Sequence, residues 1–161
     1  MATNPSVAEA PVDSPSRRRL PPLLRRAWYS LNQAFRRRVA HLDITPDQFT
    51  VLRTLLEGER IGLTQRELAQ IMSSDPNTVA SLVERMEKSG LLERAEHERD
   101  RRAHRIRVLA LGKKKFEKGR TIALALQSEV LAVLPEARRE NFLEDLTMVA
   151  DACREAGRRK K

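Results

Sequence analysis

The chain has 161 residues, of which 40% are hydrophobic, 33% charged and 4% aromatic, and this suits one compact helical domain, or one small domain with helical extensions, with solvated surfaces. Its formal net charge is +9, but residues 1–19 and 158–161 hold +5 of it, so residues 20–157 hold only +4 and basicity alone is weak support for nucleic-acid binding. The single cysteine, Cys153, excludes an internal disulfide framework, and the lack of a signal segment or of an apolar run of about 20 residues predicts a cytoplasmic protein.

Residues 1–20 are predicted to form a disordered basic leader. Proline and serine are frequent in this segment and large hydrophobic residues are few. A solvated segment is the simpler interpretation, and a basic arm that touches DNA phosphates is the alternative.

Residues 21–44 are predicted to contain a helix. Its apolar side chains recur every three or four residues and form one stripe, which is expected to pack along its whole length. Trp28 is expected to belong to a core or a subunit interface, with the wall of a ligand pocket as the alternative. The stripe consists of Leu24, Trp28, Leu31, Phe35, Val39 and Leu42.

A second helix is predicted to begin after Thr45. Threonine can cap a helix, Pro46 suits its first position, and Gln48 stands where it can complete a capping box. A turn between two glycines follows, and a brief strand is expected at 61–63. The buried face of this helix is predicted to hold Phe49, Leu52, Leu55 and Leu56.

Two short helices joined by a tight turn are predicted over residues 64–89. A second capping-box spacing opens the first of them at Thr64, Asp75 caps the second, and Gly90 ends it. Apolar residues of the second helix fall at i, i+3, i+4 and i+7, which predicts one buried stripe. This stripe consists of Val79, Leu82, Val83 and Met86.

The opposite, polar face of this second helix is predicted to read the major groove of DNA. The groove is about 12 Å wide and accepts one helix, and small polar side chains allow its first turns to approach the base edges. Free N–H groups at a helix N-terminus also favour a nearby phosphate. The alternative is an ordinary solvated helix face. The candidate DNA-binding residues are Ser74, Pro76, Asn77, Thr78, Ser81, Arg85 and Lys88.

Residues 91–95 and 105–109 are predicted to pair as the strands of a hairpin with a highly charged tip. Arginine in a projecting hairpin can enter the minor groove, where narrow A·T-rich stretches concentrate negative potential. Asp100 can brace a neighbouring arginine through a paired contact. The candidate DNA-binding residues of this wing are Arg99, Arg101 and Arg102.

In these segments the sequence resembles the MarR family of winged helix-turn-helix regulators, and the resemblance extends from Leu23 to Ala156. The matching motifs are TPDQFTVL from Thr45, LTQRELA from Leu63, NTVASLVERMEKSGLLER from Asn77, and Asp100-Arg101-Arg102 in the wing. Family members have a mainly α fold with a small β-wing, in which long N-terminal and C-terminal helices interlock two subunits. The resemblance therefore implies the same fold and a homodimer.

The resemblance also divides the chain into regions. In the family the helix after the wing starts with a threonine cap followed by a glycine, so Gly112 is expected at the cap and Lys115 at the glycine position. The terminal helices have too little of a single small domain to pack on, which agrees with a dimer. The expected regions are a winged helix-turn-helix DNA-binding lobe at 45–110, dimerisation helices at 21–44 and 111–157, and a basic tail at 158–161.

Family members usually release DNA when a small, often phenolic, molecule binds between the dimer arms and the lobes. The resemblance thus implies an organic effector, with Trp28 and His41 as candidate pocket residues. Oxidant sensing is disfavoured because the first helix has no cysteine, and Cys153 on its apolar stripe is expected to be buried. With His41, His97 and His104 scattered along the chain, no metal site is predicted.

The predicted function is that of a dimeric regulator that binds a pseudo-palindromic double-stranded DNA operator, as a repressor relieved by an organic effector. The alternative is a winged-helix interaction protein that holds an acidic protein partner without reading DNA sequence. The sequence contains no Gly-rich phosphate loop and no nucleophile elbow, so neither an enzyme nor a cofactor is expected.

Overall fold

The computed structural model describes residues 14, 18–58, 62–96 and 104–158. These residues form six α-helices, a short 3₁₀ helix and a three-stranded antiparallel sheet, which confirms the predicted mainly α class with a small β-wing. The chain divides into two compact units, the first ending at Arg120 and the second beginning at Thr121. None of the described helices is both long enough and apolar enough to cross a membrane.

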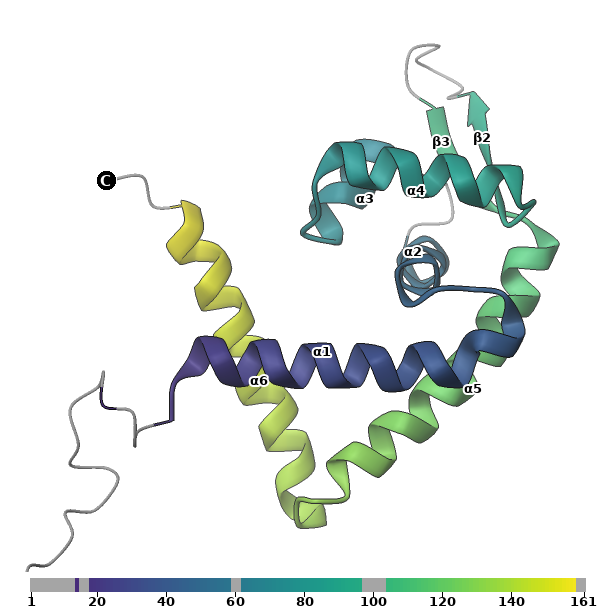
Figure 1. The fold of residues 1–161 in the computed structure, drawn as a ribbon. Helices are drawn as coiled ribbons and strands as arrows, with labels where there is room; N and C mark the ends of the chain where they lie inside the picture. The colour runs from purple at the N-terminus through teal and green to yellow at the C-terminus, as the bar shows by residue number, and fades with distance from the viewer. Residues whose placement is uncertain (1–13, 15–17, 59–61, 97–103, 159–161) are drawn as a thin grey trace, which may run out of the picture. The chain divides into compact units, whose positions relative to one another are not determined.

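Figure 1 shows the elements in chain order, with α4 and the strands β2 and β3 close together in the first unit. We refer to the segment from α2 to β3 as the winged-helix lobe. The elements are α1 (Leu20–Val39), η1 (Ala40–Leu42), α2 (Pro46–Glu57), β1 (Leu63–Thr64), α3 (Gln65–Ile71), α4 (Pro76–Lys88), β2 (Leu92–Glu96), β3 (His104–Val108), α5 (Ala110–Leu131) and α6 (Glu136–Arg158).

Two helices of the lobe begin with the predicted capping boxes. At the start of α2, the Thr45 hydroxyl accepts a hydrogen bond from the Gln48 backbone N–H at 3.2 Å, and the Gln48 side chain accepts one from the Thr45 N–H at 2.9 Å. At the start of α3, Thr64 and Glu67 make the same two bonds at 3.2 and 2.7 Å. A cap contributes about 1 kcal/mol, so local sequence alone accounts for where these helices begin.

Three aromatic rings join α1, α2 and α5 in the core of the first unit. The ring centroids of Phe35 and Phe49 are 4.9 Å apart, and those of Phe49 and Phe116 are 5.4 Å apart. Aromatic pairs in this range add about 0.5–1.5 kcal/mol beyond the area they bury. The lobe continues the core with the fully buried side chains of Leu52, Leu68, Val79, Val83, Met86, Leu91, Leu92 and Ile106.

The small sheet has the strand order β1-β3-β2, with both pairs antiparallel. In the wing, Arg94 of β2 lies opposite Ile106 of β3, and the strands lie within one residue of the predicted segments 91–95 and 105–109. Gly62 precedes β1 with φ +84°, and a Cβ on it would lie 2.7 Å from the Ile106 carbonyl oxygen. The chain needs glycine there, because both the backbone conformation and the close approach exclude a side chain.

Helix α1 does not pack along its whole length, contrary to expectation. Val39 near its end is fully buried, whereas Trp28 in its first half is 62% exposed, and Leu24 and Leu31 are exposed as well. The first half of α1 is exposed because α1 is longer than α2. The 20 residues of α1 span about 30 Å and the 12 residues of α2, against which α1 packs, span about 18 Å. Half of the apolar stripe is therefore left open.

Helix α5 begins at Ala110, so Gly112 lies inside its first turn and not at the expected cap position. A Cβ on Gly112 would overlap the carbonyl oxygen of Leu91 and would lie 2.8 Å from Cγ1 of Val108. Glycine thus serves close packing of α5 against the lobe at this position.

In the second unit, helix α6 is apolar on one side but has no buried residue. Phe142 and Leu146, which lie four positions apart on this apolar side, are exposed. Cys153, expected to be a buried hydrophobic residue, is exposed too, which corrects that prediction. An amphipathic helix needs a surface on which to bury its stripe, and residues 121–158 do not cover this one.

Candidate nucleic-acid interface

The N-terminus of α4 is held by Asp75. Its carboxylate accepts hydrogen bonds from the backbone N–H groups of Asn77 at 2.9 Å and Thr78 at 3.0 Å, while Pro76 occupies the first turn. The predicted cap is confirmed. The cap changes one expectation. The two N–H groups that were expected to favour a DNA phosphate already donate to the Asp75 carboxylate.

The turn between α3 and α4 places the first candidate DNA contact, Ser74. Ser73 has φ 50°, in the left-handed region, and the backbone N–H of Ser74 donates to the carbonyl of Ala69 at 3.0 Å. Ser74 is half-buried in this turn, whereas Pro76 is exposed. The start of α4 is therefore more exposed to solvent than Ser74.

The first two turns of α4 expose small polar side chains on a rigid support. Asn77, Thr78 and Ser81 are all exposed, while Val79 and Val83 on the opposite side are fully buried. Core packing fixes the rotation of the helix about its axis, so the polar face has a defined direction. The structure thus brings these three candidate residues together on one open surface.

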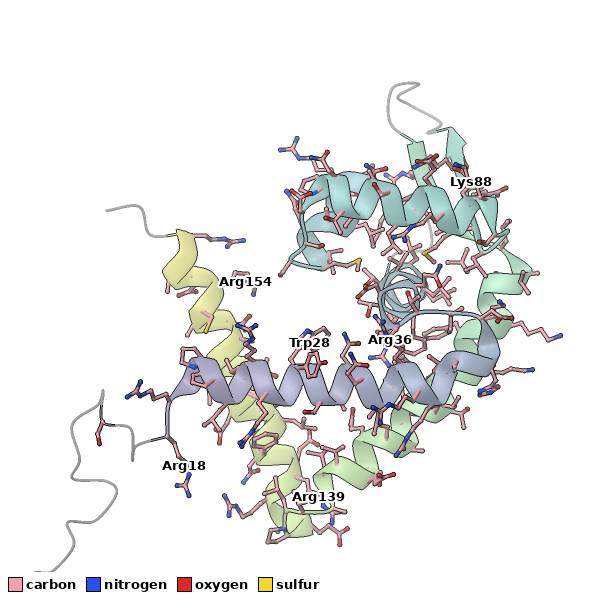
Figure 2. All side chains as sticks on the ribbon, viewed as in Figure 1. Arg18, Trp28, Arg36, Lys88, Arg139 and Arg154 are labelled. Atoms are coloured by element: carbon pink, nitrogen blue, oxygen red, sulfur yellow. The ribbon has the colours of Figure 1, made fainter. Side chains whose placement is uncertain are left out.

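The last turns of the same face are charged and internally paired. The Lys88 ammonium donates to the Glu84 carboxylate at 2.7 Å, and the Arg85 Nε donates to the carbonyl of Ser81 at 3.2 Å. The hydrogen bond from Lys88 and its charge lower the pKa of Glu84. Figure 2 shows Lys88 on the side of α4 that faces away from α2. Because the ion pair is exposed, it is weak, and the lysine is free to exchange the carboxylate for a phosphate.

A connection between α4 and the wing was missed in the sequence. The Arg94 guanidinium donates to one oxygen of the Glu87 carboxylate at 2.6 Å, and the Arg94 backbone N–H donates to the other oxygen at 3.1 Å. The two residues are separated by the turn at Gly90, which has φ +68°. The periodicity of a helix or a strand does not relate positions on opposite sides of such a turn. The only signal in the sequence is that Glu87 and Arg94 have opposite charges.

The predicted wing contacts Arg99, Arg101 and Arg102, with the bracing residue Asp100, lie outside the described residues. The strands that lead to them are held by the lobe. Arg105 of β3 donates from Nη1 to the carbonyl of Gly62 at 2.6 Å, which ties the hairpin to the segment before β1.

The structure does not bring the two candidate pocket residues together. Trp28 lies in the first half of α1 and His41 in η1, and both are exposed (Figure 2 labels Trp28). Thirteen residues of helix separate them by about 20 Å along the axis and turn them to nearly opposite sides. Within the described part of the chain, no group of three or more His, Cys, Asp or Glu side chains is placed to hold a metal ion.

Comparison with known sequences finds a family model that matches part of the chain. Residues 42–103 match the model of the MarR family. The HTH-type transcriptional regulator BilQ of Clostridium symbiosum is 32% identical over 85 residues, which make up 53% of this chain. The chain spans 59% of the length of BilQ in this match.

Solved structures share the fold over most of the chain. The MepR–DNA complex of S. aureus has a TM-score of 0.78 at 24% identity and covers 84% of this chain and 99% of its own. CouR from Rhodococcus jostii RHA1 bound to p-coumaroyl-CoA has a TM-score of 0.70 at 23% identity, with 80% and 89% covered. CouR bound to a 23-mer DNA duplex has a TM-score of 0.73 at 25% identity, with the same coverage. Residues 42–103 are thus similar to the MarR family, and most of the chain shares the fold of the solved MepR and CouR structures.

Proposed function

We propose that this protein is a sequence-specific regulator that binds double-stranded DNA as a dimer. The observation that carries the proposal is the open face of α4, where Asn77, Thr78 and Ser81 are exposed on a helix whose other side is fixed in the core. Small polar groups can donate to and accept from base edges, and a rigid support keeps their directions constant. MepR and CouR, which share the fold, have both been solved with DNA, and this supports the proposal.

A second copy of the chain is the proposed partner of the uncovered apolar side chains. In a two-fold dimer, the same surface of each copy buries the other, and two copies of α4 can meet successive major grooves about 34–36 Å apart. The operator would then be a pseudo-palindrome. Apart from Trp28, the exposed apolar side chains outside the lobe in the described residues are Leu20, Leu23, Leu24, Tyr29 and Leu31 in α1, and Leu111, Leu124, Val130, Val133, Phe142, Leu146 and Met148 in the last two helices and the turn between them.

We further propose that the protein is a repressor and that a small organic effector of phenolic type relieves repression. CouR, with the same fold, has been solved with p-coumaroyl-CoA. The ring of Trp28, which is largely exposed on α1, offers an aromatic ligand a face on which to stack.

Asn77→Ala is expected to reduce the discrimination between operator and scrambled duplex by about 1–3 kcal/mol, because one side chain that reads a base edge is lost. Affinity for the scrambled duplex should change little, because that binding depends on phosphate contacts. Fluorescence anisotropy with an operator selected from a random duplex pool measures both affinities.

Arg102→Ala is the contrasting variant in the same experiment. It removes a positive charge but no side chain of α4 that reads a base. It should therefore weaken binding to both duplexes and reduce the steepness of log K against log salt by about one unit. If the wild-type protein bound both duplexes equally and Arg102→Ala changed nothing, the DNA proposal would fail. The alternative of an acidic protein partner would then gain support.

A phenolic carboxylic acid such as p-coumaric acid is expected to quench the fluorescence of Trp28 and to release the operator over the same concentration range. Trp28 is the single tryptophan of the chain, so the signal reports on α1 alone. Trp28→Tyr, which keeps an aromatic ring, should retain the release of DNA while it removes the fluorescence signal. An operator complex that survives millimolar concentrations of several such acids would exclude this class of effector.

A further inference from the structure

We infer that Glu87 and Arg94 form a positioning pair that fixes the direction of the wing relative to α4, so that the helix and the hairpin meet DNA as one rigid body. The consequence for DNA binding rests on the proposed function. The pair itself is a property of the lobe and can be tested without DNA.

The geometry of the pair restrains direction as well as distance. Glu87 lies in the last turn of α4 and Arg94 in the middle of β2. One carboxylate oxygen accepts from Arg94 Nη1 at 2.6 Å and the other accepts from the Arg94 backbone N–H at 3.1 Å. Since both oxygens bind one residue, a rotation of the strand against the helix breaks at least one of two charge-assisted hydrogen bonds.

The position of β2 in the sheet explains why its backbone is open to this contact. In the order β1-β3-β2, strand β2 lies at an edge, where alternate backbone N–H groups have no partner strand. Arg94 lies opposite Ile106, which is buried, so its side chain shares the inner face of the hairpin. The Arg94 side chain is accordingly 30% exposed, against 72% for Lys88 on the open side of α4.

The pair supplies a second point of attachment between helix and hairpin. At the base of the wing the chain turns at Gly90, and Leu91 and Leu92 are buried in the lobe. The hairpin is also held by β1, which pairs with β3, and by the bond from Arg105 to the Gly62 carbonyl, but neither contact involves α4. Arg94 lies farther along β2, only two residues before the strand ends at Glu96. The pair therefore restrains the hairpin directly against α4.

The chain offers a matched control in the Glu84–Lys88 pair. This pair has similar length and the same charges, and it lies on the same helix. Its hydrogen bond joins two residues of α4 that are four positions apart, and Arg94 of β2 acts on Glu84 through its charge alone. Removing the Glu84 carboxylate therefore reproduces the change in charge without releasing the wing.

Glu87→Ala is expected to raise the hydrogen-exchange rates of the β2 and β3 amides about tenfold, given the usual strength of hydrogen bonds to charged groups. Its operator affinity should fall about tenfold, the size of one lost base contact. Glu87→Gln keeps an acceptor for the Arg94 N–H, so its exchange rates and its operator affinity should lie between those of Glu87→Ala and those of the wild type. Glu84→Ala should change the hydrogen-exchange rates of the hairpin less than about twofold, so exchange is the quantity that this control tests.

A double-mutant cycle with Arg102→Ala separates positioning from general support of the fold. If the pair acts through the wing, Glu87→Ala should cost less than about twofold in the Arg102→Ala background, because the contact that it positions has already gone. An equal loss in both backgrounds, or unchanged hairpin exchange in Glu87→Ala, would overturn the inference. A wild-type protein that ignored DNA sequence would defeat the proposed function, whereas faster hairpin exchange in Glu87→Ala would still support the pair.

Discussion

Alanine in place of Gly112 is expected to lower the free energy of unfolding by about 3 kcal/mol or more, although in a free helix the same change would stabilise by about 1 kcal/mol. The added Cβ would overlap the carbonyl oxygen of Leu91 and press on Val108. That carbonyl also accepts a hydrogen bond from the Leu109 backbone N–H at 3.0 Å. Backbone held in this way cannot move aside without breaking the junction of α4, the wing and α5. Urea denaturation at a fixed protein concentration measures the loss.

Two other glycines provide controls for the stability change of Gly112→Ala. A Cβ on Gly119 would lie 2.9 Å from the ring of Phe49, a side chain that can shift, so Gly119→Ala should cost about 1–2 kcal/mol. A Cβ on Gly157 in α6 would meet nothing within 4 Å, so Gly157→Ala should be neutral or stabilise by up to about 1 kcal/mol. Equal stabilities of the Gly112→Ala and Gly157→Ala proteins would refute the close approach at α5.

Local chemistry explains which features were predictable from the sequence. Thr45, Thr64 and Asp75 begin helices because each side chain bonds backbone groups two or three residues away. The stripe of α4 has a period of 3.6 residues, so its buried face and the exposure of Asn77 and Ser81 on the other face follow from spacing alone. These features involve only neighbours in the chain.

The features that the sequence did not predict depend on residues far apart in the chain. Gly112 was assigned to a cap from the family resemblance, and the approach of Leu91, 21 positions earlier, leaves no local pattern that could have corrected this assignment. The bond between Glu87 and Arg94 was missed because it spans a turn. The open half of α1 and the exposed Cys153 were missed for a different reason, since an apolar stripe predicts that a helix packs but does not say on which molecule.

Phe142→Arg is expected to convert the protein to a monomer and to weaken operator binding by about 100-fold or more, because two linked half-sites gain that much over one. Phe142 is 44% exposed in a helix that buries no residue, so the variant should keep its helical content. In the proposed dimer, however, the new guanidinium would be buried in an apolar interface without a partner, at a cost of several kcal/mol. Sedimentation velocity at micromolar concentration measures the assembly and anisotropy measures the DNA affinity.

Glu144→Gln provides the control for charge, since it also raises the net charge by one unit. Position 144 is rotated by 200° from position 142 about the helix axis, on the side of α6 away from the stripe. This variant should remain a dimer and bind the operator with the wild-type affinity or slightly more tightly. If Phe142→Arg sedimented as a dimer, α6 would not belong to the subunit interface. If the wild-type protein were already monomeric, the open apolar faces of α1 and α6 would need a different partner, and an operator of two half-sites would no longer be expected.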